Sequence, residues 1–258
     1  MTIIVPRRPI EDAASVYRGF ADPRNDLHAL AGREDFKDRT RIMIRSILDR
    51  LDFERRHRVL DIGCGDGSLL CQIAFVSSRV GTVLTGEERN RLIAIPHLAG
   101  IQFYAASFDD LTNVPGKFER IIVNNCLPLA RTLTNARRAL ENIVDLTAPG
   151  GKIWLGELQA KRLKRLQYTS KSKAIRRAYR QHGLRFAAAL LRHIIRHRRR
   201  SELFIEPRQR VWCIKPEDVP ALAADYGLKV SGIWSCEDMT GDDFYALQER
   251  YSVLLTKE

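Results

Sequence analysis

Hydrophobic residues recur along this chain with two spacings, which together predict alternating strands and helices. Short apolar runs typical of buried parallel strands occur at residues 59–62, 80–85, 101–106, 118–123, 152–155, 228–234 and 251–255. Apolar positions at helical spacing predict helices at residues 38–51, 68–75, 132–146 and 216–226. This alternation indicates an α/β fold with a doubly wound, mostly parallel seven-stranded sheet, and such sheets bind ligands outside the carboxyl ends of their strands.

A glycine-rich turn follows the first of these strands. Residues 59–70 read VLDIGCGDGSLL, in which Gly63, Gly65 and Gly67 alternate with other residues before a helix begins. Glycines let the backbone turn tightly and approach a ligand, and the helix N-terminus offers free N–H groups. Strand, turn and helix together predict a site that holds a nucleotide-like ligand.

The spacing and charge of this turn narrow the choice of ligand. The G-x-G-x-G order differs from the G-x-G-x-x-G of dinucleotide-binding proteins, and no G-K-[ST] of a P-loop is present. Asp61 and Asp66 place negative charge where a pyrophosphate would lie, which opposes an anion but suits a cation. S-adenosylmethionine carries a sulfonium and an ammonium group. The sequence here resembles the class I S-adenosylmethionine-dependent methyltransferases, whose first motif is an acid followed by G-x-G-x-G.

The resemblance covers residues 38–158 and 211–258, and it implies a Rossmann-like methyltransferase fold with S-adenosylmethionine as the cofactor. In this family an acid after the second strand binds both ribose hydroxyls, and the alignment favours Glu88 over Glu87. A polar residue and its neighbour after the third strand meet the adenine, which points to Ser107 and Phe108, although Phe108 could equally be a core aromatic. The residues that the resemblance assigns to the cofactor are Asp61, Gly63, Cys64, Gly65, Asp66, Gly67, Glu87, Glu88, Ser107, Phe108, Asp109 and Asn124.

Catalysis with this cofactor needs little from the protein beyond alignment. The methyl group is already electrophilic, so the protein positions the acceptor and can remove a proton from a hydroxyl acceptor. Asn124 and Asn125 fall where relatives line the methyl-transfer site. The N-P-P-Y pattern that binds planar nitrogen acceptors is absent, which argues against methylation of a base or a glutamine amide. No motif identifies a base. The candidate catalytic residues are Asn125, His182 and Tyr17, of which His182 and Tyr17 also fit ordinary surface positions.

Composition sets the broad class of the protein. With 258 residues, 45% of them hydrophobic and 29% charged, the chain predicts a soluble globular protein with one core and an insertion. No stretch approaches the roughly 18 apolar residues that span a bilayer, and we expect a cytoplasmic protein. Five cysteines without a CxxC pair predict neither a metal site nor a disulfide framework.

We divide the chain into an N-terminal helical cap (1–37), the methyltransferase core (38–158 and 211–258) and a basic helical lid insertion (159–210).

The net charge of +12 comes from one segment. Residues 160–210 contain 17 Lys and Arg against two acids, whereas the rest of the chain is slightly acidic. Three interpretations compete: a lid with solvated arginines, peripheral adsorption to the inner face of an anionic membrane, and binding of RNA or another polyanion. Aromatic residues are sparse in the segment and no RNA-binding module accompanies it, which disfavours nucleic acid.

These observations leave one leading hypothesis and two alternatives. The leading one is an S-adenosylmethionine-dependent methyltransferase that acts on a hydroxyl of a small-molecule, lipid-linked or glycan acceptor carrying negative charge. The first alternative is an RNA methyltransferase. The second is a cofactor-binding scaffold that has lost its chemistry and engages a membrane or a partner through the basic segment.

Overall fold

The computed structural model describes residues 37–130, 133–160, 166–168, 203–205, 213–236 and 250–258, with scattered helical positions between 175 and 195. Contacts divide the chain into two compact units. The larger comprises Glu11–Arg162 and Val211–Glu258, and the smaller comprises Met1–Ile10 and Leu163–Arg210. The smaller unit contains an antiparallel pair of strands, β6 (Leu166–Tyr168) and β7 (Leu203–Ile205). None of the helices in the described part of the chain has the length and hydropathy needed to cross a membrane.

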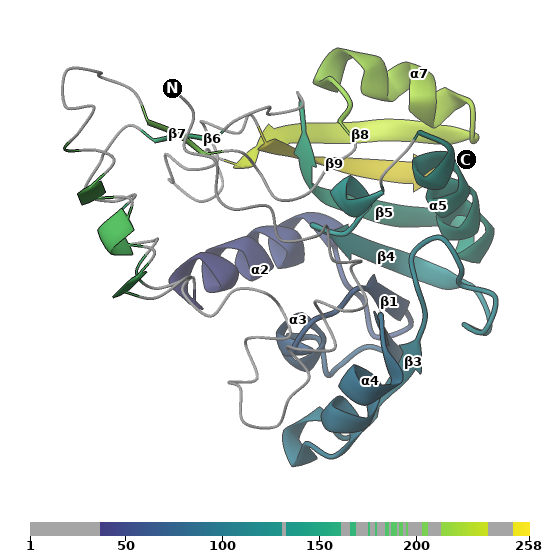
Figure 1. The fold of residues 1–258 in the computed structure, drawn as a ribbon. Helices are drawn as coiled ribbons and strands as arrows, with labels where there is room; N and C mark the ends of the chain where they lie inside the picture. The colour runs from purple at the N-terminus through teal and green to yellow at the C-terminus, as the bar shows by residue number, and fades with distance from the viewer. Residues whose placement is uncertain are drawn as a thin grey trace. The chain divides into compact units, whose positions relative to one another are not determined.

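The larger unit is built on a seven-stranded sheet with the order β3-β2-β1-β4-β5-β9-β8 (Figure 1). Neighbouring strands from β3 to β5 pair in parallel, and β9 is antiparallel to both of its neighbours. The strands are β1 (Arg58–Ile62), β2 (Ser78–Val83), β3 (Ile101–Ala105), β4 (Phe118–Asn124), β5 (Thr147–Gln159), β8 (Leu228–Ser235) and β9 (Arg250–Lys257). The doubly wound, mostly parallel sheet predicted from the sequence is therefore confirmed.

Helices cover both faces of this sheet because each buried strand is apolar on both sides. On one face, the buried residues of α2, α3 and α4 form a core with alternate strand residues such as Val59 and Ile122. On the other face, α5 and α7 pack against the intervening residues, such as Leu60 and Ile121. The helices are α2 (Lys37–Leu51), α3 (Ser68–Gln72), α4 (Gly86–Ile93), α5 (Leu133–Leu146) and α7 (Val219–Ala224), with short 3-10 turns at Pro96–Leu98, Leu127–Leu129 and Pro216–Asp218.

The structure differs from the predicted elements at two turns. Residues 149–151, expected to break the chain before the fifth strand, instead form an irregularity inside β5, which begins at Thr147. The second strand ends at Val83, two residues earlier than predicted. Gly86 therefore begins α4, and the residues expected at a strand end occupy the first turn of a helix.

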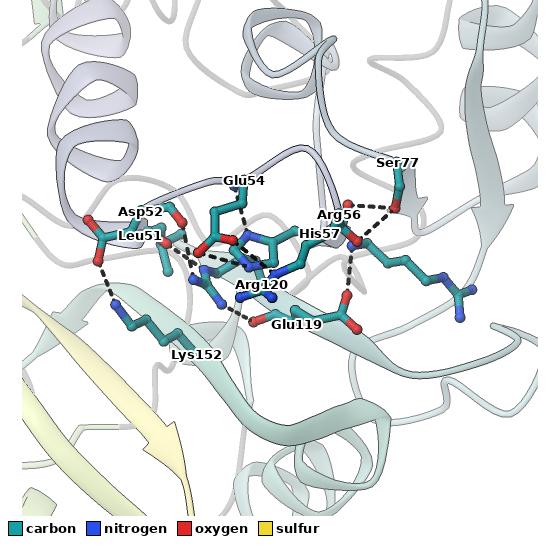
Figure 2. Close-up of polar contacts among 10 residues, drawn as sticks. Leu51, Asp52, Glu54, Arg56, His57, Ser77, Glu119, Arg120 and Lys152 are labelled. Carbon is teal, nitrogen blue, oxygen red and sulfur yellow. Dashed lines mark hydrogen bonds and ion pairs between the residues drawn. The ribbon is translucent and has the colours of Figure 1, made fainter.

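The buried Arg120 of β4 forms hydrogen bonds with the C-terminus of α2 (Figure 2). The last carbonyls of a helix have no partner within it, and the Arg120 guanidinium donates to those of Leu51 and Asp52. It also donates to the Glu119 carbonyl at 2.9 Å. Asp52 adopts a left-handed conformation with φ 45°, and its carboxylate pairs with Lys152 of β5 at 2.6 Å. These contacts fix the end of α2 against the sheet.

The same network contains a buried histidine. The Glu54 backbone N–H donates to Nδ1 of His57 at 2.9 Å, so this nitrogen serves as an acceptor. Burial, with the charge of Arg120 as a second cause, lowers the pKa of His57 below its ordinary value. His57 is therefore held neutral in the folded protein near pH 7.

Candidate functional site

The turn after β1 is held in shape by β2 and by its own glycines. Gly63, Gly65 and Gly67 all have left-handed φ values, at 71°, 57° and 73°, which glycine adopts without the strain that a Cβ would impose. The Cys64 N–H donates to the Thr82 carbonyl at 2.9 Å, and the Gly63 N–H donates to the Thr82 hydroxyl at 3.1 Å. The turn is thus anchored at its first two residues to the adjacent strand.

At Gly63 the turn also passes very close to the loop after β4. A Cβ at this position would lie 2.2 Å from Sγ of Cys126, far inside any real contact. The Cys126 thiol is itself held there, since it donates to the carbonyls of Ile62 and Asn124, each at 3.4 Å. Only glycine fits between the end of β1 and this thiol.

A cavity of about 390 Å³ opens beside the turn. Its walls come from the buried side of α2, the glycine turn, the end of β2 and the loops after β3 and β4. These are the carboxyl ends of the parallel strands, where the sequence predicts the ligand. The cavity therefore lies where the fold and the glycine motif both expect it.

The cavity is electronegative. Four carboxylates line it, those of Asp61, Asp66, Glu88 and Asp109, and no Lys, Arg or His occurs among its described lining residues. Asp61 and Asp66 are buried, with 5% and 4% of their surfaces exposed. The pKa of the Cys64 thiol is raised well above its ordinary value, first by burial and then by these two aspartates. This chemistry fits a cationic ligand, as the sulfonium and ammonium of S-adenosylmethionine require.

Glu88 and Glu87 differ sharply in their surroundings. Glu88 is 2% exposed and lines the cavity, whereas Glu87 is exposed and does not. Glu88 also forms a capping box at the start of α4: its Oε2 accepts from the Thr85 N–H at 2.9 Å, and its own N–H donates to the Thr85 hydroxyl. Burial raises the pKa of Glu88, and the hydrogen bonds from Thr85 oppose that rise. The carboxylate is thus fixed in place at the edge of the cavity by the helix that it caps.

The three residues expected near the adenine, Ser107, Phe108 and Asp109, all line the cavity. The Ser107 hydroxyl donates to Oδ1 of Asp109, which ties the loop together. Phe108 is partly buried and packs against the core that contains α5. Its side chain therefore serves both as a core aromatic and as part of the cavity wall.

Asn124 and Asn125 close the cavity at the end of β4. The Asn124 amide Nδ2 lies 3.2 Å from Sδ of Met43 on α2, and its Oδ1 is buried with no hydrogen-bond partner among the described residues. Asn125 has a left-handed φ of 59°, and its N–H donates to the Gly156 carbonyl at 3.0 Å. Both amides are therefore placed by the neighbouring elements rather than by the loop alone.

A buried ion pair that sequence reasoning missed supports Asn125. Nη1 of Arg250 on β9 donates to Oδ1 of Asn125 at 3.1 Å and to Oε2 of Glu157 at 2.7 Å. Glu157 is 2% exposed and has a φ of 57° in the bulge of β5. Its N–H donates to the Ser252 hydroxyl at 3.3 Å. An acid within an apolar strand, WLGELQ, is the sequence signal that could have revealed this cluster, because buried charges need partners.

The remaining candidates stay predictions. Tyr17 and His182 lie outside the described residues. Within the described ranges, no group of three or more His, Cys, Asp or Glu side chains could hold a metal ion. The structure thus brings Asn125 and most of the predicted cofactor residues to one cavity.

Comparison with known proteins agrees with the fold. Residues 36–230 match the model of a family described as a methyltransferase domain. A complex between the Haloferax volcanii Trm112 methyltransferase activator and its methyltransferase is similar in fold, with a TM-score of 0.58, 14% identity, and coverage of 96% of this chain and 99% of that chain.

Two further solved structures share the fold. The N-methyltransferase NodS of Bradyrhizobium japonicum WM9, in complex with S-adenosyl-L-homocysteine, aligns with a TM-score of 0.56 and 14% identity over 96% of this chain and 99% of that one. Magnesium protoporphyrin IX methyltransferase of Synechocystis PCC 6803, with bound S-adenosylhomocysteine, aligns with a TM-score of 0.55 and 12% identity over 96% of both chains. No curated protein matches this chain.

Proposed function

This chain belongs to the methyltransferase-domain family, and we propose that it transfers the methyl group of S-adenosylmethionine to a hydroxyl oxygen of a small-molecule, glycan or lipid-linked acceptor carrying negative charge. The general activity, that of an S-adenosylmethionine-dependent methyltransferase, follows from the family. The choice of a hydroxyl acceptor that carries negative charge is our proposal. The charge of the acceptor is inferred from the 17 Lys and Arg of residues 160–210, because the cavity itself is lined by carboxylates.

The residues of the glycine turn would hold the cofactor. When bound, S-adenosylmethionine supplies an electrophilic methyl group on a positively charged sulfur. Gly65 is half-buried and has no side chain to prevent close approach of the cofactor to the backbone. The buried carboxylates of Asp61 and Asp66 favour the cationic groups. Glu88, which is fixed by its cap and lines the cavity, would accept hydrogen bonds from the ribose.

The choice of a hydroxyl acceptor rests on the side-chain amides of Asn124 and Asn125, which we call the amide edge of the cavity. Asn124 and Asn125 line the cavity at the end of β4, where residues 124–128 read N-N-C-L-P and lack the aromatic ring of the N-P-P-Y pattern. Two amides offer hydrogen-bond donors and acceptors but no aromatic face, which suits a hydroxyl better than a planar nitrogen. Arg250 donates to the side chain of Asn125 and is itself paired with Glu157, so Asn125 is held in position. Alignment of the acceptor is the protein's main contribution to the reaction.

Binding and transfer are tested separately. Calorimetry with S-adenosylhomocysteine should give a saturable signal that Asp61→Asn weakens by about tenfold or more. Purified protein is then incubated with methyl-labelled S-adenosylmethionine and a panel comprising a neutral sugar, a sugar phosphate, a uronic acid, a primary amine and an RNA. We expect label on the hydroxyls of the two anionic sugars. Label confined to the amine or the RNA, or cofactor binding without any transfer, would contradict the proposal.

The amide edge is tested by Asn125→Gly. Glycine keeps the left-handed backbone at this position without strain, so the change removes only the side chain. We expect kcat to fall about 10- to 100-fold with S-adenosylhomocysteine affinity nearly unchanged. The matched control is Asn90→Ala, which removes an exposed amide on α4 and should leave both quantities as they are. Equal kcat in both variants would refute the role of Asn125.

A further inference from the structure

A stripe of exposed apolar side chains runs along the helical positions of the smaller unit. Leu184, Leu191 and Ile195 are 72%, 43% and 60% exposed, and all three are helical. On an ideal helix with 3.6 residues per turn, a spacing of seven and four residues corresponds to an arc of about 40°. We call these three residues the apolar stripe.

The sides of the helix that border the apolar stripe differ from each other. Arg185 and Arg192 are exposed and lie about 80–100° around the helix from the stripe on one side. Ala187 lies about 60° away on the other side and is buried, with 5% of its surface exposed. Ala187 is therefore covered, while the apolar stripe, Arg185 and Arg192 are exposed.

The sequence around the apolar stripe is strongly cationic. No acid occurs between Glu157 and Glu202, and residues 160–210 contain 17 Lys and Arg against two acids. Exposed apolar side chains that gather on one face mark an interaction site more often than solitary ones do. The partner of this face must offer both an apolar interior and negative charge.

We propose that the apolar stripe and its arginines adsorb to the surface of an anionic lipid bilayer. A bilayer accepts the apolar side chains at the boundary of its acyl chains, while its headgroups attract the arginines. A nucleic acid backbone satisfies only the arginines and leaves the stripe in water. Of these two partners, only the bilayer uses both properties of the helix. This inference does not depend on the reaction proposed above.

The strength of the effect can be anticipated from the two contributions. Each basic residue near an anionic surface strengthens partitioning about fivefold. Burial of half of a leucine or isoleucine side chain adds about fivefold to tenfold. Replacing all three residues of the stripe should therefore weaken binding by about 100-fold or more, and replacing both arginines should weaken it by about 25-fold.

The experiment is flotation of the full chain with vesicles. One set contains phosphatidylcholine alone, and the other contains about one third phosphatidylglycerol, which supplies the negative surface potential. We expect wild-type protein to float with the anionic vesicles only. The variant Leu184→Gln/Leu191→Gln/Ile195→Gln, which keeps helix propensity and charge, and the variant Arg185→Gln/Arg192→Gln should both remain at the bottom.

Matched controls replace the same residue types on the larger unit. Ile42, Phe75 and Ile93 are also exposed, at 45%, 51% and 54%, so their replacement by Gln tests whether any loss of exposed apolar surface lowers flotation. Arg41→Gln/Arg45→Gln serves the same purpose for charge, since both arginines are exposed on α2. These two control variants should float as wild type does. Circular dichroism and S-adenosylhomocysteine binding establish that every variant is folded.

Three results would overturn the proposal. The first is wild-type protein that floats with neither set of vesicles, and the second is equal flotation of the stripe variant and wild type. The third is that the wild-type protein and the stripe variant bind a single-stranded RNA equally tightly while neither binds lipid. That result would assign the segment to nucleic acid. Failure of the methyl-transfer assay under the proposed function would contradict the reaction but would leave lipid binding unaffected.

Discussion

Substitution of Gly63 by alanine tests how closely the glycine turn fits the loop after β4. Gly63 has a φ of 71°, and the new Cβ would lie 2.2 Å from Sγ of Cys126. The left-handed conformation costs a non-glycine residue about 1–2 kcal/mol. Overpacking adds about 1–3 kcal/mol, because the Cys126 thiol is held by the carbonyls of Ile62 and Asn124. We expect Gly63→Ala to lower the free energy of unfolding by about 2–5 kcal/mol.

Two further variants separate the conformational strain from the clash. Gly150 has a φ of 69°, and a Cβ added there would meet no atom within 4 Å, so Gly150→Ala measures the strain alone. The double variant Gly63→Ala/Cys126→Ala removes Sγ and leaves only a Cβ–Cβ contact of 3.6 Å, which is ordinary. Alanine restricts the unfolded chain equally in both single variants, so this effect cancels in the comparison.

The assay is urea unfolding monitored by circular dichroism, with S-adenosylhomocysteine binding measured alongside. Gly63→Ala should be less stable than Gly150→Ala by about 1–3 kcal/mol, and the double variant should recover most of that difference relative to Cys126→Ala. If the two single alanine variants are equally stable and Cys126→Ala brings no recovery, the thiol simply rotates away and the argument from close approach fails.

Three other predictions concern the sheet's amino end and the cofactor edge. Because the pKa of His57 is lowered on folding, chiefly by burial, its contribution to stability is present above its unfolded-state pKa of about 6.5 and is lost as the pH falls through the folded-state value. The urea concentration at the midpoint of unfolding should therefore decrease as the pH is lowered below about 6.5. This decrease should be smaller in His57→Gln. Arg120→Met should cost about 2–4 kcal/mol because the carbonyls at the end of α2 lose their donor, and thermal unfolding should show that Arg120→Lys restores little of it. Glu88→Gln should keep the helix cap but weaken S-adenosylhomocysteine binding about tenfold by calorimetry, whereas Glu87→Gln, at an exposed position, should leave affinity unchanged.

Local sequence patterns were sufficient to predict the sheet and the turn. Continuous apolar runs such as residues 121–123 of β4 occur because strands covered on both faces have no polar side there. The alternating glycines after β1 reflect three left-handed residues in one turn. Both features are encoded within a few neighbouring residues, so a single sequence reveals them.

The contacts that depend on distant residues could not be predicted in the same way. Arg250 lies 93 residues from Glu157 and 125 from Asn125. The pairing of β5 with both β4 and β9 brings the three residues together. Glu88 was predicted to contact the cofactor because it follows a strand. Its capping box was not predicted, because the box depends on where that strand ends. The ends of elements are the least certain part of a sequence pattern. Long-range pairing and element boundaries are therefore what the structure adds.

The position of β9 has a consequence for how the protein is made. This strand follows every other described strand along the chain, yet it lies between β5 and β8. During synthesis β5 and β8 each present an unpaired edge until β9 emerges from the ribosome, and open edges of this kind invite association with other chains. A released chain that ends after residue 236, and so lacks β9, should therefore aggregate more readily than the full chain.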